Sequence, residues 1–329
     1  MRAGLILFLI FIFQGSVLAF SSDLKDNIAR KISPAYSSYL KGLLSDRYGD
    51  SKRALKEYIR ARKIDKESTS LKLRLAVQYI KLDNNDKAIK LLDELKQDKG
   101  VSLDAYLLLI LLYSSKGQDE MANKEYESML SGLYEEKPDN LKIAESLAWF
   151  KMQKEDFDAA LKIYENILKL DPKYTDAYFW MGYLYEEKGE RAKAIDFWKK
   201  VLELNPEHAD ALNSLGYIYA EEGVNLDEAE VLVKKALQIT PDSAAYLDSL
   251  GWVYFKMQKF NIAKEYIEKA ASLLKDPVIL DHLGDIYYKL GEMLKAKEVW
   301  NDALNIKSDD KAIEEKIKNI EHEISATKN

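Results

Sequence analysis

The sequence predicts an all-α solenoid of about eight helix-turn-helix repeats. Only six prolines and fourteen glycines occur among 329 residues, of which 47% are hydrophobic and 32% charged, a composition that favours helices with a large core. In addition, one alanine recurs every 33 to 38 residues, a period typical of paired helices. The members of this alanine series are Ala54, Ala88, Ala122, Ala160, Ala194, Ala229, Ala263 and Ala296.

Two further series keep the same period. A position 12 or 13 residues before each alanine is small in seven of its eight occurrences, which are Gly42, Ala76, Ile110, Ala148, Gly182, Gly216, Gly251 and Gly284. Four of the six prolines also follow the period, at Pro138, Pro172, Pro206 and Pro241. Three coincident series indicate a true internal repeat.

The first helix of a repeat is illustrated by residues 175–189. Tyr178, Met181, Gly182 and Tyr185 follow the i, i+3, i+4, i+7 spacing of one helix face. Gly189 then ends this helix, since glycine is the usual residue just past a helix C-terminus.

The second helix presents Ala194 and Trp198 on its inner face and stops before Pro206, because proline cannot continue a helix. The small residue of the first helix and the alanine of the second allow the two backbones to approach closely. In the seventh repeat we therefore expect Gly251 to face Ala263 across the hairpin.

This pattern resembles the tetratricopeptide repeat family, which has a Leu-Gly pair and an aromatic residue in its first helix, an alanine in its second and a proline at its end. The matching residues here are Met181, Gly182, Tyr185, Ala194, Trp198 and Pro206. The resemblance extends from about Pro34 to Ser308. It implies a right-handed superhelix in which the first helix of each repeat lines a concave side.

The expected organisation has six parts. They are a signal peptide over 1–19, a short N-terminal helix or cap over 20–34, repeats 1–3 over 35–130, an irregular joint over 131–140, repeats 4–8 over 141–309, and a C-terminal capping helix and tail over 310–329. The capping helix is predicted because isoleucines stand at helical spacing among charged residues, at Ile313, Ile317, Ile320 and Ile324.

The N-terminus predicts export. Arg2 precedes an unbroken apolar run from Leu5 to Phe13, and small residues at Val17 and Ala19 suit cleavage after Ala19. We expect a periplasmic or secreted protein; the alternative is a membrane anchor, for which the run is short. The chain contains no cysteine, so disulfides, thiol chemistry and a lipid anchor on an N-terminal cysteine are not expected.

The first helix of each repeat carries the small residue on the side that packs on the second helix, and we call this row of residues the packing stripe. A second row of residues beside it is the predicted binding site. In the concave groove that the resemblance implies, it carries aromatic side chains edged by carboxylates and an amide. Aromatic residues are favoured at binding hot spots, and the acidic edge favours a partner with Lys or Arg. We therefore expect this groove to bind an extended peptide or a partner helix. The alternative is that the rings pack against neighbouring helices and close the groove. The candidate residues are Trp149, Phe179, Tyr183, Asn213, Tyr217, Asp248, Trp252 and Asp281.

Catalysis, cofactors and metals are not expected. The three histidines, His208, His282 and His322, are scattered, and no pair has metal-ligand spacing. The sequence contains no nucleophile elbow and no phosphate-binding glycine loop. A net charge of −6 argues against nucleic acid, which needs clustered Lys and Arg.

A closer resemblance covers roughly 141–304. The runs ALNSLGYIYAEEGVNLDEAEVLVKKAL, YLDSLGWVYF and DHLGDIYYKLGE are similar to a group of bacterial envelope repeat proteins that includes lipoprotein adaptors of carboxyl-terminal processing proteases. The resemblance implies an adaptor for a periplasmic protease, although this chain lacks the lipidated cysteine. The alternative is an assembly factor for a pilus, secretion or exopolysaccharide machine.

Overall fold

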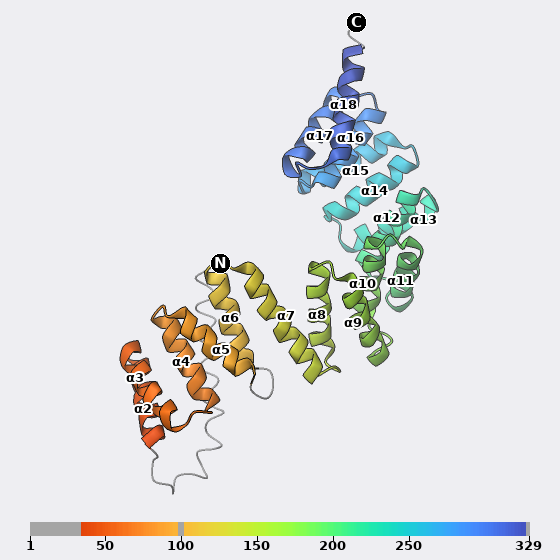
Figure 1. The fold of residues 1–329 in the computed structure, drawn as a ribbon. Coiled ribbons are helices and arrows are strands. Elements are labelled where there is room, and N and C mark those ends of the chain that lie inside the picture. The colour runs from red at the N-terminus through yellow and green to blue at the C-terminus, as the bar shows by residue number, and fades with distance from the viewer. Residues whose placement is uncertain (1–33, 98–101, 327–329) are drawn as a thin grey trace. The chain divides into compact units, whose positions relative to one another are not determined.

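The computed structural model describes residues 34–97 and 102–326, and the regular structure of these residues is entirely helical (Figure 1). The predicted signal peptide and nearly all of the predicted N-terminal cap lie in residues 1–33, outside the described residues. The helices pack pairwise, each first helix on the second helix that follows it, which confirms the expected helix-turn-helix repeats. The chain divides into two compact units, an N-terminal unit ending at Pro138 and a C-terminal unit beginning at Asp139.

Among its described residues, 34–97 and 102–138, the N-terminal unit contains three helix pairs. We call the first helix of each pair its A helix and the second its B helix. The pairs are α2 (Pro34–Arg47) with α3 (Ser51–Ile64), α4 (Thr69–Lys81) with α5 (Asn85–Lys96), and α6 (Leu103–Ser115) with α7 (Asp119–Glu136).

The C-terminal unit contains five pairs and a final single helix. The pairs are α8 (Leu141–Gln153) with α9 (Phe157–Leu170), α10 (Thr175–Glu187) with α11 (Arg191–Leu204), α12 (Ala209–Glu222) with α13 (Leu226–Ile239), α14 (Ala244–Lys256) with α15 (Phe260–Leu273), and α16 (Pro277–Lys289) with α17 (Met293–Ile306). Helix α18 (Lys311–Ala326) packs on α17. No helix within residues 34–97 and 102–326 is both long enough and apolar enough to cross a bilayer.

The packing stripe behaves as predicted. A Cβ atom added to Gly251 would collide with Ile267 of α15 and lie 3.1 Å from the carbonyl oxygen of Ala263. Gly251 therefore faces the B helix, as expected. The equivalent Gly182 lies against the indole of Trp198, which is 1% exposed. Only glycine leaves room for these side chains between two helix backbones.

Most turns between the A and B helices use one left-handed residue, whereas the turn between α12 and α13 uses two, Gly223 and Asn225. Gly189 ends α10 with a φ of +74°, as its position in the sequence predicts. Glu155 occupies the equivalent place after α8 with a φ of +58°. Glycine is favoured in this conformation because a Cβ atom is strained there.

The four residues that exceed the repeat period lengthen a helix. Residues 131–136 belong to α7, which has 18 residues, whereas α9 has 14. The irregular segment expected over 131–140 is thus limited to 137–140, and the side chain of Asn140 caps α8 by accepting a hydrogen bond from the backbone of Ile143 at 3.2 Å.

The C-terminal cap is formed as expected. Ile313, Ile317 and Ile320 of α18 are buried against the core of the C-terminal unit. The helix covers an apolar end that the last repeat would otherwise expose to water, which is the role of a capping element in a repeat protein.

Candidate peptide-binding surface

A pocket with several polar side chains lies on the A-helix face of the C-terminal unit. It has a volume of about 280 Å³ and lies between α10, α12, α14 and the start of α16. We call it the acceptor pocket. Its lining contains three carboxylates and, among the described residues, neither lysine nor arginine. The lining residues used below are Glu186, Asn213, Tyr217, Asp248, Asp276 and Val278. The structure thus brings together three of the predicted residues, namely Asn213, Tyr217 and Asp248.

Asn213 supplies an unused acceptor. Its Oδ1 atom is buried, and no described residue donates a hydrogen bond to it. Leaving a buried acceptor unpaired costs about 1–3 kcal/mol. A donor from a bound ligand would recover that free energy, so Asn213 is the part of the pocket best prepared for a partner.

Burial shifts the pKa of one carboxyl group of the pocket, that of Glu186. Burial, together with the neighbouring charge of Glu187, raises the pKa of Glu186 above its ordinary value. The ionised form of this side chain is therefore destabilised in the free protein. A positively charged ligand would favour the ionised form and would therefore lower the pKa of Glu186 on binding.

Asp248 is held by a histidine of the next A helix. Both carboxylate oxygens lie 3.0 Å from Nδ1 of His282, and both residues are buried. Burial lowers the pKa of His282, but the charge and hydrogen bond of Asp248 oppose it, so the pKa of His282 lies above its ordinary value. Asp248 and His282 stand 34 positions apart, one repeat length, and this spacing is the sequence signal from which their proximity could be inferred.

Trp252 is a packing residue of this surface. It is only 7% exposed, and its ring stacks on His282 with centroids 3.9 Å apart and on Phe255 at 4.6 Å. The indole Nε1 donates a hydrogen bond to the carboxylate of Glu221 on the preceding A helix. Trp252 therefore follows the alternative considered from the sequence, in which the ring packs against neighbouring A helices instead of lining an open groove.

A second group of aromatics remains partly open to solvent. Trp149 is 45% exposed and Tyr183 is 37% exposed. Both lie edge-on to Trp180, with centroids 5.0 and 6.0 Å away. Phe179 lies 5.1 Å from the same ring and stacks on His208. We call Trp149, Phe179, Trp180 and Tyr183 the aromatic cluster; Trp180, which the sequence did not place, lies at its centre.

The remaining predicted residue, Asp281, is engaged elsewhere. Its carboxylate accepts hydrogen bonds from Lys316 of α18 at 2.7 and 2.9 Å. Lys316 also forms an ion pair with Asp285 at 2.7 Å. Asp281 therefore helps to attach the capping helix, and it does not line the acceptor pocket.

The acceptor pocket is suited to a charged N–H donor. Glu186 and the Oδ1 atom of Asn213 are acceptors, whereas the carboxylate of Asp248 is already hydrogen-bonded to His282. A metal ion would need several converging ligands. In the part of the chain that the structure describes, no three His, Asp or Glu side chains are grouped in a way that could hold one.

The family of the chain follows from its repeats. Profiles of the tetratricopeptide repeat match residues 151–213, 197–231, 244–274 and 279–310. These residues of the chain therefore consist of tetratricopeptide repeats. Proteins built from this repeat are generally non-catalytic scaffolds.

Solved structures share the same fold. A tetratricopeptide repeat protein from Parabacteroides merdae is 19% identical over 87% of this chain and 98% of its own, with a TM-score of 0.50. The Cut9–Hcn1 hetero-tetramer of the APC/C is 16% identical over 87% of this chain and 69% of its own, with a TM-score of 0.54. PilF of Pseudomonas aeruginosa is 24% identical over 50% of this chain and 75% of its own, with a TM-score of 0.45. No curated protein sequence matches the chain. At these identities the first two comparisons show the fold alone, and the similarity to PilF, with a TM-score below 0.5, carries no conclusion.

Proposed function

We propose that this protein is a non-catalytic scaffold that binds a peptide segment of a partner protein on the A-helix face of its C-terminal unit. The observation that carries the proposal is the unpaired, buried Oδ1 of Asn213 in a pocket lined by carboxylates. A lysine or arginine side chain of the partner fits this environment, because it carries several donors and a positive charge.

The aromatic cluster would supply contact area beside the charged anchor. Trp149 and Tyr183 are the exposed members of that cluster, and Tyr183 lies one helical turn before Glu186 on α10. Burial and a hydrogen bond with Glu187 raise the pKa of Tyr183 to about 12, so its hydroxyl stays protonated at neutral pH and donates to that carboxylate. Aromatic rings contribute affinity, and the carboxylates set orientation and the rate of association.

The binding test uses two peptides of equal length, GSKLKLGS and GSELELGS, titrated into the wild-type chain and into Asn213→Leu. The matched control is Asn319→Leu, at an exposed position of α18 outside the pocket. The glutamate peptide should bind equally to the wild type and to Asn213→Leu, whereas the lysine peptide should bind to the wild type through the acceptor pocket. Because a hydrogen bond to a charged group is worth about 1.5–3 kcal/mol, Asn213→Leu should weaken that binding by about tenfold or more.

Two results would contradict the proposal. One is an equal loss of affinity for both peptides in Asn213→Leu. The other is a loss in Asn319→Leu as large as the loss in Asn213→Leu. Circular dichroism should show the same helix content in all three proteins, since leucine at position 213 removes an unpaired acceptor without enlarging the side chain.

More specific roles depend on the partner. Export through residues 1–19 would place the scaffold in the periplasm, where it would be an adaptor for a protease or, alternatively, an assembly factor for an envelope machine. The N-terminal apolar run and the repeat sequences over 141–304 support these roles. A pull-down from envelope extract distinguishes these two roles. The baits are the chain without residues 1–19 and the same chain with Asn213→Leu. Capture of a protease that the variant loses favours the adaptor, and capture of assembly subunits favours the second role.

A further inference from the structure

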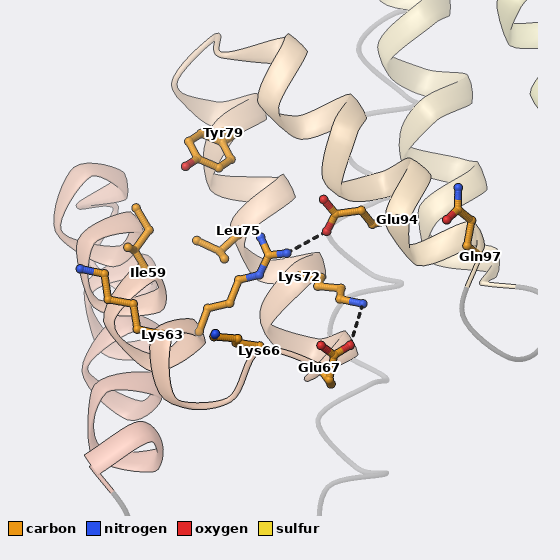
Figure 2. A pocket seen from close by; sticks show the side chains of 10 residues that line it. Ile59, Lys63, Lys66, Glu67, Lys72, Leu75, Tyr79, Glu94 and Gln97 are labelled. Carbon is orange, nitrogen blue, oxygen red and sulfur yellow. Dashed lines mark hydrogen bonds and ion pairs between the residues drawn. The ribbon is translucent and has the colours of Figure 1, made fainter.

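The N-terminal unit contains a second and larger pocket. It has a volume of about 830 Å³, within the range of sites that hold a ligand or a short peptide segment. Figure 2 shows side chains from three consecutive helices around it: Ile59 and Lys63 on α3, Leu75 and Tyr79 on α4, and Glu94 on α5.

The charge of this pocket is opposite to that of the acceptor pocket. Four cationic side chains and two carboxylates line it, in a chain whose net charge is −6. We call it the basic pocket. Its charged residues are Arg62, Lys63, Lys66, Lys72, Glu67 and Glu94.

Internal ion pairs neutralise only part of this positive charge. Arg62 pairs with Glu94 at 2.7 Å. Lys72 lies 4.0 Å from Glu67, whose side chain is 91% exposed, so that pair is weak. Lys63 and Lys66 are exposed, and neither forms an ion pair with a described residue. Two positive charges at the rim are therefore available to a ligand.

The inner wall of the basic pocket is apolar. Leu75 is buried, and Ile59 and Tyr79 are half-buried beside it. A ligand that fills this volume consequently needs an apolar group for the wall and negative charges for the rim. Glu67 and Glu94 would repel a chain of closely spaced phosphates, so the pocket suits an acidic peptide better than a nucleic acid.

We infer that the basic pocket binds an acidic peptide segment of a partner, with carboxylates at Lys63 and Lys66 and an apolar side chain against Ile59, Leu75 and Tyr79. This site lies wholly within the N-terminal unit. It is independent of the acceptor pocket, because the two sites lie in different units and select ligands of opposite charge.

The test measures fluorescence anisotropy of two labelled peptides, EELEEL and KKLKKL, with the purified chain. The test variant combines Lys63→Glu and Lys66→Glu. The control combines Lys52→Glu and Lys56→Glu, which change the charge equally at exposed positions of the same helix, α3, outside the pocket.

The wild type should bind EELEEL, whereas KKLKKL should bind no more weakly to the test variant than to the wild type. Reversing two charges removes two ion pairs and adds two repulsions, so the test variant should bind EELEEL about tenfold more weakly. The control should change affinity by less than about twofold, since charges outside the site act only through screened, long-range attraction.

Three outcomes would overturn the inference. They are absence of EELEEL binding to the wild type, an equal loss in the control variant, and equally tight binding of a labelled six-nucleotide DNA strand, which would indicate an anion site without peptide selectivity. Circular dichroism and thermal unfolding of both variants verify that any loss of affinity arises in the folded protein.

Discussion

Two tryptophans that occupy equivalent positions in the repeat should respond differently to truncation. Trp252→Ala removes a ring that is 7% exposed, whereas Trp149→Ala removes one that is 45% exposed. The first ring is stacked between His282 and Phe255 and donates to Glu221. The second ring has an edge-on contact with Trp180.

The magnitudes follow from burial. Truncating a core tryptophan to alanine costs about 3–5 kcal/mol, because the lost burial is joined by a cavity. Trp252→Ala should fall in that range and also leave Glu221 without its indole donor. Trp149→Ala should cost about 1 kcal/mol, close to the value of one aromatic pair. We therefore expect the two free energies of unfolding to differ by about 2–4 kcal/mol.

The assay is urea unfolding followed by far-ultraviolet circular dichroism at matched protein concentration. Because repeat proteins can unfold in segments, the whole curve is compared with that of the wild type, and not only a single midpoint. Trp252→Ala should move the transition of the C-terminal unit to much lower urea. The reasoning is refuted if Trp149→Ala destabilises the protein as much as Trp252→Ala does.

Two more predictions concern buried polar groups. Gln78→Leu should raise the free energy of unfolding by about 1–3 kcal/mol, because both amide atoms of Gln78 are buried without a partner among the described residues. Leucine fits this place, since the equivalent residues of two other repeats are Leu112 and Leu184. Thermal or urea unfolding measures the effect, and an unchanged or lower stability would contradict the prediction. Since the folded-state pKa of His282 lies above its ordinary value of 6.5, the stability from its pair with Asp248 is fully present below about pH 6.5 and is lost as the pH rises through the folded-state pKa. Thermal unfolding between pH 6 and pH 9 should therefore show declining stability in the wild type and a flatter profile in Asp248→Asn, and an identical decline in both would exclude this pair as its origin.

The fold could be predicted from the sequence because the packing constraint is local and repeated. Gly251 and Ala263 are small because two helices approach closely at these positions. The same requirement recurs in each repeat with only small changes in spacing. The sequence shows four more residues than the usual repeat period near Ser131, but it does not show that they extend a helix. Nothing in the period itself distinguishes a longer helix from a loop.

The candidate site could be predicted only in part. Helical periodicity gives the direction of a side chain around its own helix, and it placed Asn213 and Asp248 on the correct face. It does not show how closely the next A helix approaches, so it could not show that His282 covers Trp252. The pairing of Asp281 with Lys316 depends on the position of α18, which lies beyond the repeats.

The basic pocket was not predicted at all. Its residues come from a B helix, a connecting loop, an A helix and the following B helix, and they follow no single stripe. Lys63 and Lys66 look like ordinary exposed lysines in the sequence, and only the three-dimensional arrangement places them beside Leu75.

The most direct test of binding at the acceptor pocket is site-specific photo-crosslinking. A photoreactive amino acid replaces either Val278, which lines the pocket and is 52% exposed, or Val231, which is 65% exposed on the B helix α13. We predict that a captured partner crosslinks from position 278 and not from position 231, and that Asn213→Leu abolishes the crosslink. Crosslinking from position 231 alone, or equally from both, would contradict a binding surface on the A-helix face.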